Sequence, residues 1–505
     1  MRDPFTKPFC RPEDLGLAIP DSDHAVSVCL PRWRDVIGYE EGDPDVIETF
    51  ECGYPRFVLH PFVAELFLAA QKEFAKKDEV AIVFPSLAAA WRCADYVKRR
   101  RETSCRLESY GWGDLTVLLL DESAYDIAWK CWQHGGEIVS SRLAESALTD
   151  GPLEDEVVEA GGKALQILKE RLAGFHEDVS EGDVFLFSSG MAAIFAVHRL
   201  LLARKPAAPT IQIEFPYLDS FKMQEEFGDG GVIDFSMTTS GGLDEVSQWF
   251  EEGGEAAGVY TELPSNPLLK TADLKGILAI LRAKEIPLIV DDTVATSVNV
   301  NGFLYADVLT TSLTKLFSGA GDVAAGAVIL NPASPFYAVL KEDLALEESA
   351  SPLFARDAIT LEINSRHFEE RVRATNENGQ ELVSWLRERP EIEALWYPDH
   401  CCRENYDEVR RSDGGYGALF SMRLKGEQAA LERFYDALEI SKGPSLGTDF
   451  SLVCPYTLLA HYNELDWAAE RGATSDLIRG WVGLEDPEDL ISRFERAFEA
   501  MKEPK

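Results

Sequence analysis

Between residues 184 and 331 the sequence alternates between short apolar runs and longer amphipathic segments, and no other feature limits the fold as strongly. A short apolar run is typical of a buried strand, and apolar residues at helical spacing are typical of a helix that covers a sheet. Strands that alternate with helices form a mostly parallel sheet with helices on both faces. We therefore expect an α/β fold. The predicted strands are 184–187, 210–215, 258–262, 287–292, 308–313 and 325–331, and the predicted helices are 191–204, 220–227 and 272–284.

The segments on either side of this alternation have a different pattern. Residues 1–40 are rich in proline and predict an arm that wraps another part of the molecule. Residues 40–130 predict a small α/β unit with a structural role, with helices at 61–76 and 87–101 and strands at 79–84 and 116–120. Beyond residue 340, one long helix over 355–388 precedes short strands and helices, which is typical of an α+β domain. We expect an N-terminal arm and extension (1–135), a large α/β domain (136–345) and a C-terminal α+β domain (346–505).

The charge balance excludes some classes of partner. Acidic residues number 87 and basic residues 49, which gives a net charge of −38. Binding of nucleic acid or of an anionic membrane surface needs excess Lys and Arg, so we expect neither partner. The nine cysteines form no CxxC pair and the eight histidines form no HExxH pattern, so we predict no metal site. Scattered cysteines are typical of reduced thiols, and we expect a cytoplasmic protein.

Three motifs stand where predicted strands end. In SSGMAAI (188–194) small residues begin a helix, and the free N–H groups of a helix start can bind a phosphate. In IVDDT (289–293) a strand ends in Asp291, at the sheet edge where α/β ligands bind. In TTSLTKLFSGAGD (310–322) a strand ends in two hydroxyls and a lysine, and burial would make that lysine a usable nucleophile. Taken singly, each motif is also typical of an ordinary turn or helix cap.

Taken together, the three motifs supply what a pyridoxal 5'-phosphate (PLP) site requires. A lysine binds the aldehyde of this cofactor, a carboxylate keeps its pyridine nitrogen protonated, and amides and hydroxyls hold its phosphate. The combination therefore predicts PLP as the cofactor.

The same motifs resemble the Cys/Met-metabolism family of PLP-dependent enzymes, and several strings are most similar to its fungal-type cystathionine γ-synthases. This resemblance implies an aspartate-aminotransferase-like (fold type I) architecture. The strings, which extend the resemblance back to about residue 18, are AIPDSDHAVSVCLPRWRDVIGYEEG, GYPRF, SSRLAE, FPYLDSFK and CPYTLLAHYNELDWA.

The resemblance also implies roles for individual residues. Most of these roles concern the cofactor. The backbone N–H groups of Gly190 and Met191 and the hydroxyls of Ser312 and Thr314 would bind its phosphate, and Lys315 would bind its aldehyde. Asp291 would contact the pyridine nitrogen, Asn266 the ring hydroxyl and Tyr217 the face of the ring. Lys315 and Tyr217 would also move protons. Arg479 would bind the substrate carboxylate, since a guanidinium binds a carboxylate with two parallel hydrogen bonds, and Ser445 would lie near the lysine. Arg142 would reach a phosphate across a subunit interface.

The sequence departs from the family pattern in three places. Ser140 stands where many members have a tyrosine before Ser-Arg, and Asp292 replaces a common asparagine. Gly480 and Trp481 follow Arg479 where members have a small polar stretch. Trp481 either reshapes the substrate pocket or is a core aromatic residue.

The activity implied by the resemblance is γ-replacement on an O-acyl-L-homoserine, as in cystathionine synthesis from cysteine during methionine biosynthesis. A carbon or nitrogen nucleophile in a specialised pathway, or a lyase-type elimination, are alternatives that use the same cofactor residues. An inactive scaffold is disfavoured because Lys315, Asp291 and Arg479 are all present, and a Rossmann dehydrogenase because no GxGxxG follows a strand. A homodimer or homotetramer is expected, with Arg142 or Arg56 reaching the partner.

Overall fold

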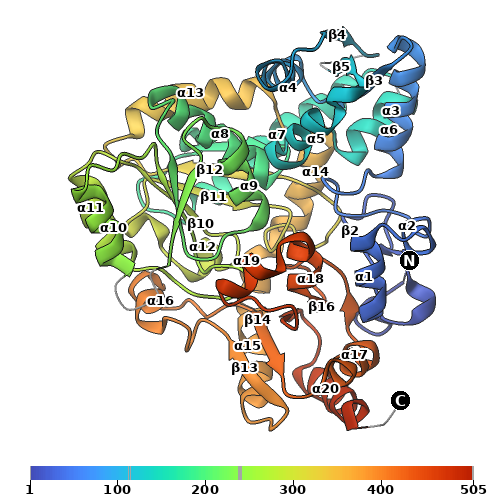
Figure 1. The fold of residues 1–505 in the computed structure, drawn as a ribbon, viewed down its shortest axis with the longest axis vertical. Helices are drawn as coiled ribbons and strands as arrows, with labels where there is room; N and C mark the ends of the chain where they lie inside the picture. Colours follow the sequence, from blue (N-terminus) through green and yellow to red (C-terminus); the bar gives the residue numbers. More distant parts are fainter. Residues whose placement is uncertain (1, 112, 114, 150, 237–241, 503–505) are drawn as a thin grey trace.

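A seven-stranded sheet lies at the centre of the computed structural model, which describes residues 2–111, 113, 115–149, 151–236 and 242–502 (Figure 1). All of its strands run parallel except β12, which is antiparallel to both neighbours. The mostly parallel sheet that the sequence predicts is thus confirmed. In spatial order its strands are β6 (Val184–Phe187), β12 (Gly326–Leu330), β11 (Val308–Ser312), β10 (Leu288–Asp291), β9 (Val259–Glu262), β7 (Thr210–Ile213) and β8 (Val232–Phe235).

The sequence did not predict the direction of β12 or the presence of β8. The link between β11 and β12 contains no helix, so it cannot carry the chain back across the sheet and β12 has to run antiparallel. Strand β8 was missed because it is a sheet edge, half-buried and interrupted by the exposed Asp234, and so lacks a continuous apolar run.

Alternate residues of each central strand face two separate layers of helices. Val184 and Leu186 of β6 belong to the core that includes Leu168 and Leu361, whereas Phe185 and Phe187 pack with residues of the opposite layer. One layer contains α7 (Asp155–Ala173), α10 (Gly242–Glu251), α11 (Leu274–Arg282) and α14 (Ala355–Asn364), and the other contains α8 (Gly190–Arg204) and α13 (Tyr337–Ala350). Helix α9 (Leu218–Glu226) lies beside α8.

The predicted helix over 355–388 is two helices. A 3₁₀ turn at Ser365–His367 separates α14 from α15 (Phe368–Arg387). At this point side chains take the carbonyls that would continue the helix: Ser365 donates to Leu361 O (2.7 Å), and Arg371 donates to Asn364 O (2.8 Å). A serine that bonds back to the preceding turn weakens a helix locally, and this competition accounts for the break.

The C-terminal part forms a second, smaller sheet whose order is β13-β14-β17-β16-β15. Its apolar residues are continuous with one core of the large sheet. Its strands are β13 (Ile392–Trp396), β14 (Leu419–Leu424), β15 (Ser441–Lys442), β16 (Leu452–Pro455) and β17 (Ile478–Trp481), and its helices include α16 (Arg403–Val409), α17 (Gln428–Ala437), α18 (Tyr456–His461), α19 (Leu465–Glu470) and α20 (Pro487–Lys502).

The N-terminal extension has its own apolar core, which runs from Val63 to Ala144. Its three-stranded sheet, in the order β3-β5-β4, is antiparallel, and the half-buried strand β4 was not predicted. Its elements are α3 (Pro61–Phe74), β3 (Glu79–Phe84), α4 (Leu87–Arg100), β4 (Cys105–Ser109), β5 (Thr116–Asp121), α5 (Tyr125–Gly135) and α6 (Ser141–Thr149). Helix α5 packs on α8 and α9, so the extension contacts the large domain.

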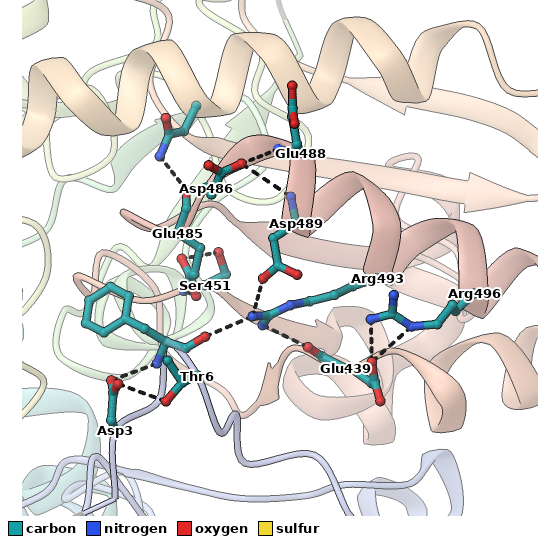
Figure 2. Close-up of polar contacts among 12 residues, drawn as sticks. Asp3, Thr6, Glu439, Ser451, Glu485, Asp486, Glu488, Asp489, Arg493 and Arg496 are labelled. Carbon is teal, nitrogen blue, oxygen red and sulfur yellow. Dashed lines mark hydrogen bonds and ion pairs between the residues drawn. The ribbon is translucent and has the colours of Figure 1, made fainter.

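The proline-rich arm lies along the C-terminal part of the molecule, beside α17 and α20 (Figure 1). Buried Arg493 of α20 donates to Phe5 O (2.8 Å) and to Glu439 O (3.1 Å) and pairs with Asp489, as Figure 2 shows. Fully buried Lys442 donates to Pro31 O (2.8 Å) at the other end of the arm. The arm then enters α1 (Trp33–Glu41) and α2 (Pro44–Ile47).

Within the described ranges, no helix is long and apolar enough to cross a bilayer. All nine cysteines are free thiols, and most of them are buried.

The attachment of the arm yields a test. Replacement of Arg493 by Met keeps the apolar stem but leaves the carbonyls of Phe5 and Glu439 without their donor, which should cost about 1.5–3 kcal/mol. The expected result is faster protease cleavage within the arm and a lower melting temperature. Arg496→Met is the matched control, because Arg496 is an exposed residue of the same helix that pairs with Glu439 on the surface. Equal effects of the two changes would contradict the assignment.

Candidate functional site

The carboxyl ends of β9, β10 and β11 open into a cavity of about 620 Å³. Its wall is built by the large domain, the C-terminal domain, the extension and the segment that precedes the extension. Most of the residues singled out in the sequence line this cavity: Gly190, Met191, Tyr217, Asn266, Asp291, Ser312, Thr314, Lys315 and Arg479.

The start of α8 forms one end of the cavity. Ser189 has an extended backbone and caps the helix by accepting the Ala192 N–H (3.0 Å). The first N–H groups of a helix have no partner within it, so those of Gly190 and Met191 are suited to an anion. A Cβ at Gly190 would lie 2.8 Å from Ser312 Cβ, so only glycine lets the helix start approach the end of β11 this closely. Ser312 and Thr314 add hydroxyls, and the group fits a phosphate.

Lys315 projects its amine into the cavity. Its Nζ donates to Ser445 Oγ (3.0 Å) and lies 4.6 Å from the centre of the Tyr54 ring. Burial lowers the pKa of Lys315, and the nearby charge of Arg479 lowers it further, although Tyr54 opposes this. Burial alone would raise the pKa of Tyr54, but the positive charges of Lys315 and Arg56 outweigh it and the net shift is downward. The amine is therefore easier to deprotonate than an exposed lysine, as a nucleophile or base requires.

Two carboxylates lie side by side at the edge of the sheet. Asp291 and Glu262 are register partners on β10 and β9, and both line the cavity. Burial raises the pKa of Asp291, although the Thr293 N–H (2.9 Å) stabilises its charged form. Burial together with the charge of Asp291 raises the pKa of Glu262 to about 8. Two carboxylates this close favour a cationic partner, which fits a protonated pyridine nitrogen.

Asp292 has a structural position. Its carboxylate accepts the Ser297 hydroxyl (2.6 Å), it is 2 % exposed and it does not line the cavity. Burial raises its pKa to about 6.

A buried ionic cluster fixes the position of Tyr217. Arg56 donates to the Tyr217 hydroxyl (2.5 Å) and pairs with Asp219 (2.8 Å), and His134 Nδ1 lies 2.8 Å from the other oxygen of that carboxylate. Burial opposes both charges, yet each is stabilised by the other, so the pKa of Arg56 is raised and that of Asp219 is lowered. The Tyr217 N–H in turn donates to Glu262.

This cluster corrects one expectation. The 40–130 unit was expected to be structural, but Tyr54, Arg56 and Lys130 all line the cavity. Tyr54 and Arg56 belong to the GYPRF string, whose tyrosine and arginine were the available signal. Asp219 lies in the FPYLDSFK string but was not singled out there, and His134 was missed because a lone His in a helix carries no motif.

Arg479 lies on β17 of the C-terminal domain and lines the cavity. It donates to Asn266 Oδ1 (3.2 Å) and Pro444 O (2.7 Å), and its guanidinium lies over the Tyr456 ring at 4.8 Å. The Asn266 N–H donates to Glu262 (3.1 Å). Arg479 is thus held in place while part of it faces the cavity.

Ser445 and Arg142 do not line the cavity. Ser445 is connected to the cavity by its hydrogen bond with Lys315, which does line it. Arg142 donates to Asp322 O (2.7 Å) and lies 3.4 Å from the carboxylates of Asp322 and Asp357. The structure therefore does not bring Arg142 to the cavity of its own chain.

Trp481 is a core residue. It is 3 % exposed, its Nε1 donates to Thr448 O (2.7 Å), and it is absent from the cavity wall that the structure describes. Gly480 is required by packing, because a Cβ there would lie 2.3 Å from the Phe420 ring. Of the two interpretations of Trp481, the core aromatic agrees with the structure.

Comparison with known proteins places these features in a family. Residues 164–499 match the model of the Cys/Met metabolism PLP-dependent enzymes, and residues 62–140 match the N-terminal domain of fungal trans-sulfuration enzymes. The chain is 31% identical to the cystathionine gamma-synthase of Neurospora crassa over 97% of this chain and 99% of that protein. It is 30% identical to the cystathionine gamma-synthase-like enzyme iboG2 of Amanita muscaria, over 97% of each.

Solved structures support the fold. The cystathionine gamma synthase of Xanthomonas oryzae pv. oryzae, in complex with cystathionine, is similar with a TM-score of 0.59 and 22% identity, over 68% of this chain and 87% of that chain. A structure titled metB from Corynebacterium glutamicum has a TM-score of 0.59 and 24% identity, over 70% and 88%. The predicted fold type I architecture is thereby confirmed.

The close approach of α8 to β11 yields a second test. Gly190→Ala should force the helix start away from Ser312 and weaken the binding of PLP, the cofactor of the matched family, by about tenfold or more. Visible absorbance retained after dialysis measures this. Gly162→Ala is the control, because a Cβ at Gly162 meets no atom within 4 Å. Unchanged retention in Gly190→Ala would contradict the assigned phosphate position.

Proposed function

Because this chain belongs to the family of Cys/Met-metabolism PLP-dependent enzymes, we propose that it catalyses γ-replacement on an O-acyl-L-homoserine. The favoured nucleophile is the thiol of cysteine, and the product is then cystathionine. One observation carries the proposal: Ser445 bonds to both key residues, through its hydroxyl to Lys315 (3.0 Å) and through its carbonyl to Arg479 (3.2 Å). An amino acid whose carboxylate binds Arg479 therefore has its α-carbon within reach of Lys315.

The cofactor is PLP, which when bound supplies an electron sink for negative charge that develops on the substrate. In our assignment Asp291 keeps the pyridine nitrogen protonated and Tyr217 lies against the ring. Lys315 would hold the aldehyde of the cofactor through Nζ. The remaining contacts are the N–H groups of Gly190 and Met191 and the hydroxyls of Ser312 and Thr314 on the phosphate, with Asn266 on the ring hydroxyl.

The proton transfers belong to Lys315. Its lowered pKa leaves Nζ able to take the proton from Cα. Lys315 passes that proton on and takes a second one from Cβ, and the γ-acyloxy group departs as a carboxylate. The deprotonated thiol of the nucleophile then forms the new bond at Cγ, and the two protons return to Cβ and Cα. Tyr217, whose hydroxyl is held by Arg56, is placed to assist a proton step.

Two alternatives use the same residues. One is a carbon or nitrogen nucleophile in place of the thiol, as in a specialised pathway. An elimination without any nucleophile, as in the lyases, is the other. Both differ from the favoured reaction only after the acyloxy group has left.

We further propose a cytoplasmic homodimer or homotetramer in which Arg142 serves the neighbouring subunit, whereas Arg56 lies in the cavity of its own chain and pairs with Asp219. The free thiols support the compartment, and the family resemblance supports the assembly. The division into 1–135, 136–345 and 346–505 is likewise proposed; the separate core of the extension supports an N-terminal unit, although this core continues to Ala144.

A product assay tests the proposed reaction. Purified protein is given O-acetyl- or O-succinyl-homoserine, each with cysteine or alone, and the products are identified by mass spectrometry. The proposal expects cystathionine to form faster than 2-oxobutyrate when cysteine is present. Ester consumption that yields only 2-oxobutyrate would contradict it, and aldehydes, ketones and amines would then be screened as nucleophiles.

The two neighbouring aspartates provide a matched pair of variants. Asp291→Asn removes the charge that faces the cavity and should lower kcat by about 100-fold. Asp292→Asn keeps a hydrogen-bond partner for Ser297 and should leave kcat nearly unchanged. Steady-state kinetics distinguish the two. Similar losses in both variants would show that Asp291 has no special role.

A further inference from the structure

Glu40 is an ionisable residue of the cavity wall with no partner among the residues that the structure describes. It lies near the end of α1, it is half-buried, and it lines the same cavity as Lys315. No hydrogen bond or ion pair joins its carboxylate to any residue that the structure describes. Several other charged groups that line the cavity are paired: Lys130 with Glu226 (2.5 Å), Lys222 with Glu464 (2.9 Å) and with Glu225 (3.0 Å), and His461 with Glu464 (2.9 Å).

The position of Glu40 is fixed by its neighbours. Tyr462 donates to Glu41 (2.6 Å) and so ties the end of α1 to the segment that follows α18. The Tyr39 ring stacks on Phe50 with centroids 5.5 Å apart. The start of α1 is held by a bond from Trp33 N to Asp436 (2.8 Å). Glu40 is therefore presented to the cavity by an anchored helix.

A carboxylate in this position favours a cation from outside the chain. Burial raises the pKa of Glu40 to about 7, so its charged form is costly until a positive charge approaches. Tyr39 also lines the cavity, and an aromatic ring beside a carboxylate is a suitable surface for an ammonium group.

We propose that Glu40 binds the ammonium group of the second substrate, the nucleophile. This inference rests on the proposed function. In that reaction the first substrate gives its amine to the cofactor and its carboxylate to Arg479, so it has no free cation left. The ammonium at Glu40 then belongs to the molecule that attacks Cγ. An amine-bearing nucleophile such as cysteine is favoured over a neutral carbon nucleophile.

Equilibrium binding tests the site independently of turnover. Choline is the probe, because its quaternary ammonium group cannot condense with an aldehyde. Calorimetric titration of the holoenzyme should show binding that is about tenfold weaker in Glu40→Gln, the loss expected for one partly buried ion pair. Glu41→Gln is the control, since Glu41 is exposed, lies outside the cavity wall and keeps an acceptor for Tyr462 after the change. Absence of binding to the unchanged enzyme, or equal affinity in Glu40→Gln, would overturn the inference.

A series of thiols then tests the role in the reaction. Cysteine and cysteamine carry the ammonium group, whereas 3-mercaptopropionate carries only the carboxylate. The unchanged enzyme should prefer the first two, and Glu40→Gln should raise their KM about tenfold with little change in ester consumption without nucleophile. Equal use of all three thiols would contradict the inference. Choline binding that depends on Glu40, with no thioether from any thiol, would overturn the proposed function and leave the ammonium site in place.

Discussion

The carboxyl ends of β9, β10 and β11 lie side by side, and this arrangement determines where the chemistry can occur. Parallel pairing places Glu262, Asp291 and Ser312 at one edge of the sheet although they are distant in the sequence. Two neighbouring carboxylates and a buried lysine are unfavourable alone, and each has a perturbed pKa for that reason. A cofactor with a cationic ring nitrogen, an aldehyde and a phosphate satisfies all of these groups together with the start of α8.

The C-terminal domain and the N-terminal segments add further residues to the cavity at this edge of the sheet. The C-terminal domain contributes Arg479 and Ser445, and the hydrogen bonds of Ser445 connect Arg479 to Lys315. The segment before the extension contributes Tyr54 and Arg56, and the buried pair of Arg56 with Asp219 joins that segment to α9. Breaking one partner of such a pair leaves an uncompensated charge, so the cluster specifies how the segment docks. Helix α1, which follows the proline-rich arm, adds Glu40 to the cavity wall.

Much of this arrangement can be predicted from the sequence, because strand ends and helix starts carry local signals. The alternation of strands and helices predicts the sheet, and the motifs around Gly190, Asp291 and Lys315 predict residues that the fold brings to one cavity. Three kinds of feature could not be predicted. The antiparallel β12 follows from a missing crossover helix, the break at Ser365 depends on side chains that bond to backbone carbonyls of the helix end, and Glu40 and Asp219 gain significance only from neighbours distant in the sequence.

The account depends most on the position of Lys315, since every proposed contact is arranged around its amine. Reduction of the holoenzyme with borohydride, followed by digestion and peptide mass spectrometry, would locate the covalently attached cofactor. The account predicts the adduct on the peptide that contains Lys315. An adduct on Lys130 or Lys222, which also line the cavity, or on no lysine of the cavity wall, would contradict it.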